Sequence, residues 1–271
     1  MEMSDPLVQV KGLTVKAGRR HLLSDIDWTV ERGQQWVVFG LNGCGKTTLL
    51  SAISGYRRYS SGSVSLFGER TTAENIFQIR KKVGWVSGSF FDTHYKNESA
   101  LEIILAGKTG TLGLDGSIGV SDVRLAKEML GEIGLADKVD MPFCTLSKGE
   151  RQNIMLIRAL INDPKILILD EPCSGLDIVS RERVLHMVRR LINESRVTVV
   201  YVTHYAEEVL DVFTHALLLK GGKRYYSGGF DEAFSDGVVS GLLGYPAVVD
   251  RDHAALKISF DFPLDERGWL A

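Results

Sequence analysis

Alternating apolar and polar residues predict β structure at the start of the chain. Residues 7–17 and 22–30 alternate along their length, as expected for strands that bury one face. An apolar run at 36–39 and a short run at 64–68 follow, with glycine-containing segments between them. We therefore predict a small antiparallel β layer in front of a buried strand over 36–39.

Later in the chain, helical patterns alternate with short apolar runs. In residues 121–134, for example, apolar positions recur at the three- and four-residue spacing of one helix face. Helices are predicted from residue 49 onward and over 72–82, 98–106, 121–134, 149–162, 178–194 and 205–212. Buried strands are predicted over 82–86, 166–169, 197–202 and 216–219. Because continuous apolar strands are typical of parallel sheets covered on both faces, the predicted fold class is α/β.

These elements suggest one domain, 1–271, with a helical subdomain set into an α/β core. The core comprises residues 7–86 and 148–230, and the helical subdomain comprises 87–147. Residues 231–271 are less regular and are predicted to form a C-terminal appendage.

Four shorter segments complete the prediction. Residues 87–91 and the glycine-rich stretch 107–119 are predicted to be loops. In the appendage, a short helix is expected near 230–235 and a strand over 255–260.

Composition narrows the classes of function. The 271 residues carry a formal net charge of −2, which gives no overall basic surface for nucleic acid. Cys44, Cys144 and Cys173 lack paired spacing, which favours a reducing compartment over a disulfide framework. The N-terminus lacks the pattern of a signal peptide, and no apolar run approaches the roughly 18 residues that span a bilayer. We therefore expect a cytoplasmic protein that reaches a membrane only through a partner.

The most specific motif lies at residues 40–48, which match the phosphate-binding pattern G-x-x-x-x-G-K-[ST]. A predicted strand before it and a predicted helix after it supply the context that the motif requires, which argues against a chance match. The candidate nucleotide-binding residues are Gly40, Asn42, Gly43, Cys44, Gly45, Lys46, Thr47 and Thr48. Backbone N–H groups of such a loop surround phosphates, the lysine reaches the β- and γ-phosphates, and the threonine hydroxyl binds Mg²⁺.

An acidic pair and a histidine follow two other buried strands. Asp170 and Glu171 end the run at 166–169, where phosphate-loop ATPases hold the carboxylate associated with Mg²⁺. Glu171 is then placed to orient or deprotonate a water molecule. His204 ends the strand at 197–202, and the carboxyl ends of parallel strands form one ligand crevice. The alternatives are an acidic pair that simply ends a surface strand and a histidine with a structural role.

Residues 146–150, Leu-Ser-Lys-Gly-Glu, precede the predicted helix at 149–162. Ser147 and the backbone amides that follow it can bind an anion at the start of that helix. The alternative is an ordinary helix cap, which uses the same residue types.

The order of these motifs resembles the ATP-binding subunit of an ABC transporter over about residues 7–230. The signature loop of that family corresponds to 146–150, its Walker B strand to 166–170, its D-loop to 174–177 and its H-loop to His204. The resemblance implies a P-loop NTPase core and a head-to-tail dimer with two ATP molecules, each with Mg²⁺, at the interface. Ser147 and Gly149 would contact the ATP of the other subunit, and Asp177 would contact the phosphate loop of the other subunit. Lys46, Glu171 and His204 would be catalytic, while Thr47 and Asp170 would hold the metal.

The chain departs from the family pattern in three regions. Ala17 stands where the family usually has an aromatic residue that stacks on adenine, so base stacking is expected to be weak or supplied elsewhere. Residues 87–89, Ser-Gly-Ser, stand where the family has a glutamine that senses the metal and couples to the transport domain. Lys148 and Glu150 also differ from the usual signature, although Ser147 and Gly149 are retained.

The resemblance implies an ATP-hydrolysing subunit that works with separate membrane subunits on the inner face of the cell membrane. The nearest subgroups are the molybdate-type and iron-complex-type importer ATPases and photorepair-like ATPases. We therefore expect import of a metal, an oxyanion or a metal chelate, with a second copy of the chain as dimer partner. The alternative is a soluble ABC ATPase that acts in nucleic-acid repair or as a regulatory switch.

Overall fold

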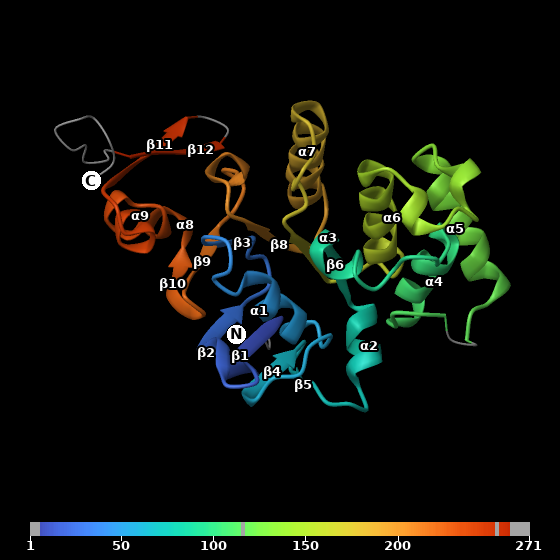
Figure 1. Cartoon of the computed structure of the whole chain (residues 1–271), viewed down its shortest axis with the longest axis horizontal. Coiled ribbons are helices and arrows are strands. Elements are labelled where there is room, and N and C mark those ends of the chain that lie inside the picture. Colours follow the sequence, from blue (N-terminus) through green and yellow to red (C-terminus); the bar gives the residue numbers. More distant parts are fainter. Residues whose placement is uncertain (1–5, 115–116, 253–254, 261–271) are drawn as a thin grey trace.

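The computed structural model describes residues 6–114, 117–252 and 255–260 (Figure 1). An antiparallel sheet opens the chain, with the strand order β2-β1-β4-β5. Its strands are β1 (Val8–Ala17), β2 (Arg20–Val30), β4 (Ser61–Leu66) and β5 (Glu69–Arg70). In β1, Val8 and Val10 are buried while Lys11 is exposed, as the alternating pattern requires. The predicted antiparallel layer is therefore confirmed.

A second, six-stranded sheet forms the centre of the molecule, in the order β10-β9-β3-β8-β7-β6. Its strands are β3 (Trp36–Phe39), β6 (Val83–Ser87), β7 (Ile166–Asp170), β8 (Thr198–Thr203), β9 (His215–Lys220) and β10 (Lys223–Gly229). The first five pair in parallel, and β10 is antiparallel to β9. Every residue of β3, β7 and β8 is buried, which explains their unbroken apolar runs.

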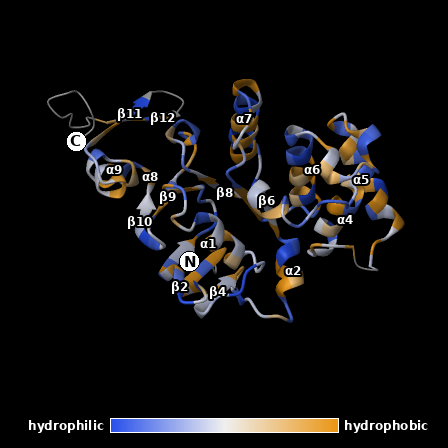
Figure 2. Ribbon diagram, viewed as in Figure 1, coloured by the Kyte–Doolittle hydropathy of each residue, from blue (hydrophilic) through white to orange (hydrophobic). Residues whose placement is uncertain are grey.

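Helices cover the sheets and build the helical subdomain. On the core lie α1 (Lys46–Ile53), α2 (Ile76–Lys81) and α7 (Ile178–Glu194). The predicted helical subdomain, 87–147, contains α3 (Gly88–Phe91), α4 (Ala100–Thr109) and α5 (Val120–Glu132), with 3₁₀ turns at Ala136–Lys138 and Phe143–Thr145. Helix α6 (Lys148–Leu160) follows it. Helices α4, α5 and α6 gather on one side of the molecule in Figure 1 and pack on one another. Hydrophilic and hydrophobic residues mix along α6 and α7 (Figure 2), as expected for helices with one face on the protein.

The predictions of loops at 87–91 and 107–119 are each wrong in part. Residues Gly88–Phe91 form the short helix α3, because Phe90 and Phe91 pack against Trp85, with ring centroids 4.7 and 5.2 Å apart. Helix α4 continues through Gly107 to Thr109, and Gly110 ends it with a left-handed conformation. Residues 115–116 of the predicted loop lie outside the described residues.

The predicted helix over 205–212 is wrong. Only a 3₁₀ turn forms there, Ala206–Glu208. The Glu208 carboxylate turns inward and accepts hydrogen bonds from Thr203 Oγ1 at 2.6 Å and Tyr201 Oη at 3.1 Å. The Val209 carbonyl accepts a hydrogen bond from the Leu256 N–H. These tertiary contacts hold the backbone in a non-helical conformation.

The C-terminal part begins with α8 (Phe230–Ala233) and α9 (Asp236–Leu243). A hairpin of β11 (Ala247–Asp252) and β12 (Ala255–Phe260) follows. The helix near 230–235 and the strand at 255–260 are confirmed, whereas α9 and β11 were not predicted. Within the described part of the chain, no helix is long and apolar enough to cross a membrane.

Candidate functional site: a nucleotide site at the carboxyl ends of the sheet

The phosphate loop connects the buried strand β3 to helix α1. Gly40 packs so closely on β9 that a Cβ atom there would collide with the Leu219 carbonyl oxygen. Gly45 has a φ of 108°, and an added Cβ would lie 2.6 Å from the Leu23 side chain. Gly45 is also the N-cap of α1, so no side chain caps the first amides of this helix. The loop thus presents uncapped N–H groups at a helix N-terminus, the arrangement that binds phosphate.

Lys46 directs its ammonium group back across this loop. Its Nζ donates to the Gly40 carbonyl oxygen at 2.8 Å and to the Leu41 carbonyl oxygen at 3.4 Å. It also forms an ion pair with Glu171 Oε1 at 3.3 Å. The Lys46 side chain is only 4% exposed, so its charge acts where water screens it little.

Asp170 lies at the end of β7, beside the first turn of α1. Thr47 Oγ1 donates to Asp170 Oδ1 at 3.3 Å, and Ser87 Oγ donates to Asp170 Oδ2 at 2.9 Å. Burial raises the pKa of Asp170 to about 6, and the two hydroxyl groups oppose that shift. A buried carboxylate beside a threonine hydroxyl is a donor set of hard oxygens, which fits Mg²⁺.

Glu171 and His204 lie on neighbouring strand ends, because β7 and β8 pair in parallel. His204 Nδ1 is 3.1 Å from Glu171 Oε1, within hydrogen-bond distance. Glu171 has a φ of 51°, a conformation that is uncommon for a residue with a side chain and is found at functional sites. The Glu171 carboxylate therefore lies between two cationic or polar groups, Lys46 and His204.

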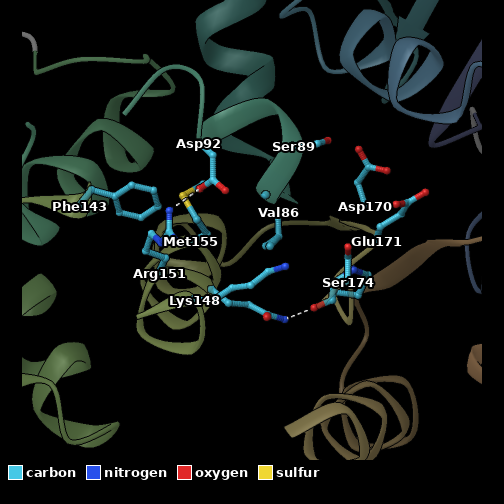
Figure 3. Close-up of a pocket in the computed structure, with 13 residues that line it drawn as sticks. Val86, Ser89, Asp92, Phe143, Lys148, Arg151, Met155, Asp170, Glu171 and Ser174 are labelled. Carbon is cyan, nitrogen blue, oxygen red and sulfur yellow. Dashed lines mark hydrogen bonds and ion pairs between the residues drawn. The ribbon is translucent and has the colours of Figure 1, made fainter. Parts of the chain in front are cut away.

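A cavity of about 240 Å³ opens beside the acidic pair, between β7 and the start of α6 (Figure 3). Glu171 and Ser174 line one side, and Lys148 and Arg151 of α6 line another. Lys148 Nζ occupies the space that a Cβ atom at Gly175 would need, so this side chain lies against the D-loop of its own chain.

The signature residues lie at the start of α6, whose Lys148 lines the cavity beside the acidic pair. Ser147 is the N-cap of α6: its Oγ accepts from the Glu150 N–H at 3.3 Å, and its own N–H donates to Glu150 Oε2 at 2.8 Å. Gly149 is exposed and has no atom within 4 Å of an added Cβ. Among the described residues, no hydrogen bond or ion pair joins Ser147 or Gly149 to the phosphate loop of the same chain.

Two further predicted residues have clear local surroundings. Asp177 caps α7, where its carboxylate accepts from the Ser180 N–H at 2.9 Å and from Ser180 Oγ at 2.7 Å. The Ser180 N–H holds the pKa of Asp177 below its ordinary value. Ala17 is exposed at the end of β1 and pairs with Arg20 across the turn to β2.

The remaining residues of the phosphate loop differ in exposure. Asn42 and Gly43 are exposed, Thr48 is half-buried and Cys44 is buried.

A buried polar network behind the acidic pair was missed by the sequence reasoning. Cys173 Sγ lies 3.3 Å from Tyr201 Oη, which in turn donates to the Glu208 carboxylate. Burial raises the pKa of Cys173 to about 12, so this thiol stays protonated. The contacts join three separate segments, and local sequence patterns contain no signal for them.

Comparison with known proteins agrees with this geometry. The model of the family described as ABC transporter matches residues 23–174. The chain is 36% identical to the uncharacterized ABC transporter ATP-binding protein YlmA of Bacillus subtilis, over 89% of this chain and 92% of the relative. It is 31% identical to the sulfate/thiosulfate import ATP-binding protein CysA of Bordetella pertussis, over 91% of this chain and 68% of the relative.

The fold of the chain is also similar to that of a solved structure. The chain superposes on CbiO1 of Clostridium perfringens, part of the ABC transporter complex CbiONQ, with a TM-score of 0.67. This match covers 87% of the chain and 93% of the neighbour at 23% identity. The site combines a phosphate loop, an acidic pair and a histidine at adjoining strand ends. Together with these matches, it shows that the chain belongs to the ABC transporter ATPase family and has the P-loop NTPase fold.

Proposed function

We propose that this chain is the ATP-binding and ATP-hydrolysing subunit of an ABC importer. The observation that carries the proposal is the convergence of Lys46, Thr47, Asp170, Glu171 and His204 at one end of the central sheet. These residues come from three separate segments: the start of α1, the end of β7 and the residue that follows β8.

In the proposed site, the loop amides and the Lys46 ammonium bind the phosphates of ATP. The Gly40 carbonyl oxygen that now accepts from Lys46 keeps the ammonium directed into the loop. Thr47 and Asp170 would hold Mg²⁺, which supplies charge neutralisation at the phosphates when it is bound. Burial of Asp170 makes its carboxylate a strong partner for a cation, because little water competes for it.

Glu171 serves as the base that accepts a proton from the attacking water. In the structure its carboxylate forms an ion pair with Lys46. Phosphates that bind to Lys46 weaken this pair, so binding frees the carboxylate to face the water. His204 keeps a hydrogen-bond contact to the same Oε1 atom, and it is placed to steady both Glu171 and the terminal phosphate.

A second copy of the chain completes the site. Ser147 and Gly149 lie at an exposed helix N-terminus, and no hydrogen bond or ion pair between described residues joins them to the phosphate loop of their own chain. In the proposed head-to-tail dimer, this helix end faces the ATP held by the partner, and Asp177 faces the partner's phosphate loop. Each of the two sites then needs residues from both copies.

Mixing two inactive variants tests this composite site. Lys46→Ala removes the phosphate loop's ammonium, and Ser147→Arg blocks the signature helix, so each variant alone should release almost no phosphate. A mixture that exchanges subunits contains heterodimers with one intact site, and recovery of about a quarter of the parental rate is expected from random pairing of independent sites. Phosphate release after mixing measures the recovery.

The matched control for that experiment is Lys46→Ala mixed with the double variant Lys46→Ala/Ser147→Arg. No dimer in this mixture holds an intact site, so it should stay inactive. If the first mixture also stays inactive while its components exchange subunits, each site is built within one chain and the proposed dimer is wrong.

We propose further that the ATPase acts on separate membrane subunits, at the inner face of the membrane, to import a metal, an oxyanion or a metal chelate. The import function named for the CysA relative supports this direction of transport.

Proteoliposomes that contain the chain and its co-purified membrane subunits should accumulate labelled molybdate or iron chelate only with ATP on the side of this chain. The Glu171→Gln variant should abolish that accumulation. A chain that purifies without membrane protein and hydrolyses ATP faster when DNA is added would instead support the soluble alternative.

A further inference from the structure

Ser87 is the last residue of β6 and lies directly beside Asp170. The two residues are register partners in the parallel pairing of β6 with β7. Ser87 is fully buried, and its hydroxyl donates to Asp170 Oδ2 at 2.9 Å. The side chain is therefore enclosed at the metal-binding end of the sheet, with the carboxylate as the acceptor of its proton.

The two oxygens of Asp170 are held by hydroxyl groups from two different elements. Oδ1 accepts from Thr47 on α1, and Oδ2 accepts from Ser87 on β6. Because Asp170 is only 2% exposed, bulk water has little access to replace either donor. Loss of the Ser87 hydroxyl would remove this donor from Oδ2 and leave the carboxylate held by Thr47 through Oδ1.

The Ser87 side chain does not cap the helix that begins beside it, although serine commonly does so at this position. It is the N-cap residue of α3, where a serine side chain commonly accepts a hydrogen bond from the helix amides. Here its side chain makes no capping hydrogen bond. The nearby Ser89, which lines the cavity in Figure 3, has its Oγ 3.4 Å from Ser87 Oγ. The Ser87 hydroxyl is thus used for Asp170 instead of for the helix that begins beside it.

We propose that Ser87 is a positioning residue that holds the Asp170 carboxylate in the orientation needed to bind Mg²⁺. This inference rests on the proposed function, because it assigns Asp170 to the metal. It also links the start of the helical subdomain, at α3, to the metal site through one side-chain hydrogen bond. A displacement of α3 would strain this bond and weaken the hold on the metal.

Metal binding measured apart from catalysis tests the proposal. Mn²⁺ serves as the probe, its free concentration is read by electron paramagnetic resonance, and the full-length chain is saturated with a non-hydrolysable ATP analogue. Ser87→Ala should weaken Mn²⁺ binding by about tenfold, as expected for one hydrogen bond to a charged group. Affinity for the analogue in EDTA should stay within about twofold of the parent, because the phosphate loop is intact.

Two more serine variants and one control make the result specific. Ser87→Thr keeps the hydroxyl and should bind Mn²⁺ within about threefold of the parent. Ser87→Cys keeps the volume with a poorer donor, so it should show the same metal-specific loss as Ser87→Ala even if that variant folds poorly. Thr93→Ala removes an exposed hydroxyl shortly after α3 that makes no bond to Asp170, and this variant should bind like the parent.

Different outcomes overturn different statements. Parental Mn²⁺ affinity in folded Ser87→Ala or Ser87→Cys would overturn the role of Ser87 while leaving the proposed ATPase intact. Equal losses with Mn²⁺ and in EDTA would show a structural role only, and would also overturn it. A parent chain that binds the analogue equally well with and without Mn²⁺ would overturn the proposed metal site and this inference together.

Discussion

Glu171→Gln is expected to stop ATP turnover while ATP stays bound. The substitution keeps the size of the side chain and an oxygen that can face His204, which lies 3.1 Å from Oε1 in the parent. It removes the negative charge that accepts a proton from water, so the phosphate-release rate should fall at least about a hundredfold. The phosphate loop and the residues proposed to hold Mg²⁺ are unchanged, so ATP affinity should remain near that of the parent.

The consequence of slow turnover should be visible in the assembly state. With Mg²⁺ and ATP, Glu171→Gln should elute from a sizing column as a dimer that persists, because hydrolysis no longer opens it. Glu207→Gln is the matched control: Glu207 is exposed in the 3₁₀ turn after His204 and should leave the rate unchanged. Hydrolysis by Glu171→Gln at the parental rate would show that another group activates the water.

Lys46→Ala is expected to abolish ATP binding. The Lys46 ammonium is nearly buried and is directed into the phosphate loop by two carbonyl oxygens. Its loss removes charge-assisted hydrogen bonds to the phosphates at a point where little water can replace them, so affinity should fall at least about a hundredfold. Isothermal titration with ATP measures the change.

The matched control for Lys46→Ala is Lys127→Ala, on the exposed part of α5. It removes the same charge from the chain but leaves the loop intact, and it should bind ATP like the parent. Lys46→Arg keeps the charge but replaces the compact ammonium, which donates to two loop carbonyl oxygens, with a planar guanidinium of different hydrogen-bond geometry, so it tests the geometry. Unchanged affinity in folded Lys46→Ala would refute the role of the loop in phosphate binding.

Most of the fold follows from patterns within single segments. The continuous apolar runs of β3, β7 and β8 predicted buried strands, because a parallel sheet covered on both faces tolerates little else. The phosphate loop was recognisable because its glycines and its lysine occur at fixed spacing between a strand and a helix. These features depend on neighbours in sequence, which a pattern can represent.

The errors lie where distant residues decide the local conformation. Residues 205–212 have helical spacing, yet the buried Glu208 carboxylate and the contact between Val209 and Leu256 keep them from forming a helix. Likewise, α3 forms because Phe90 and Phe91 pack against Trp85. Sequence spacing contains no information about such partners, because they lie on other elements.

The sequence by itself determined the identities and order of Lys46, Asp170, Glu171 and His204, and it placed each at the end of a predicted strand or the start of a helix. Only the tertiary structure decided which of them touch. The strand order β3-β8-β7-β6 brings Glu171 against His204 and Ser87 against Asp170. The physical reason is that parallel neighbours in a sheet are joined by long crossover connections, so their pairing and register are set by packing across the whole core.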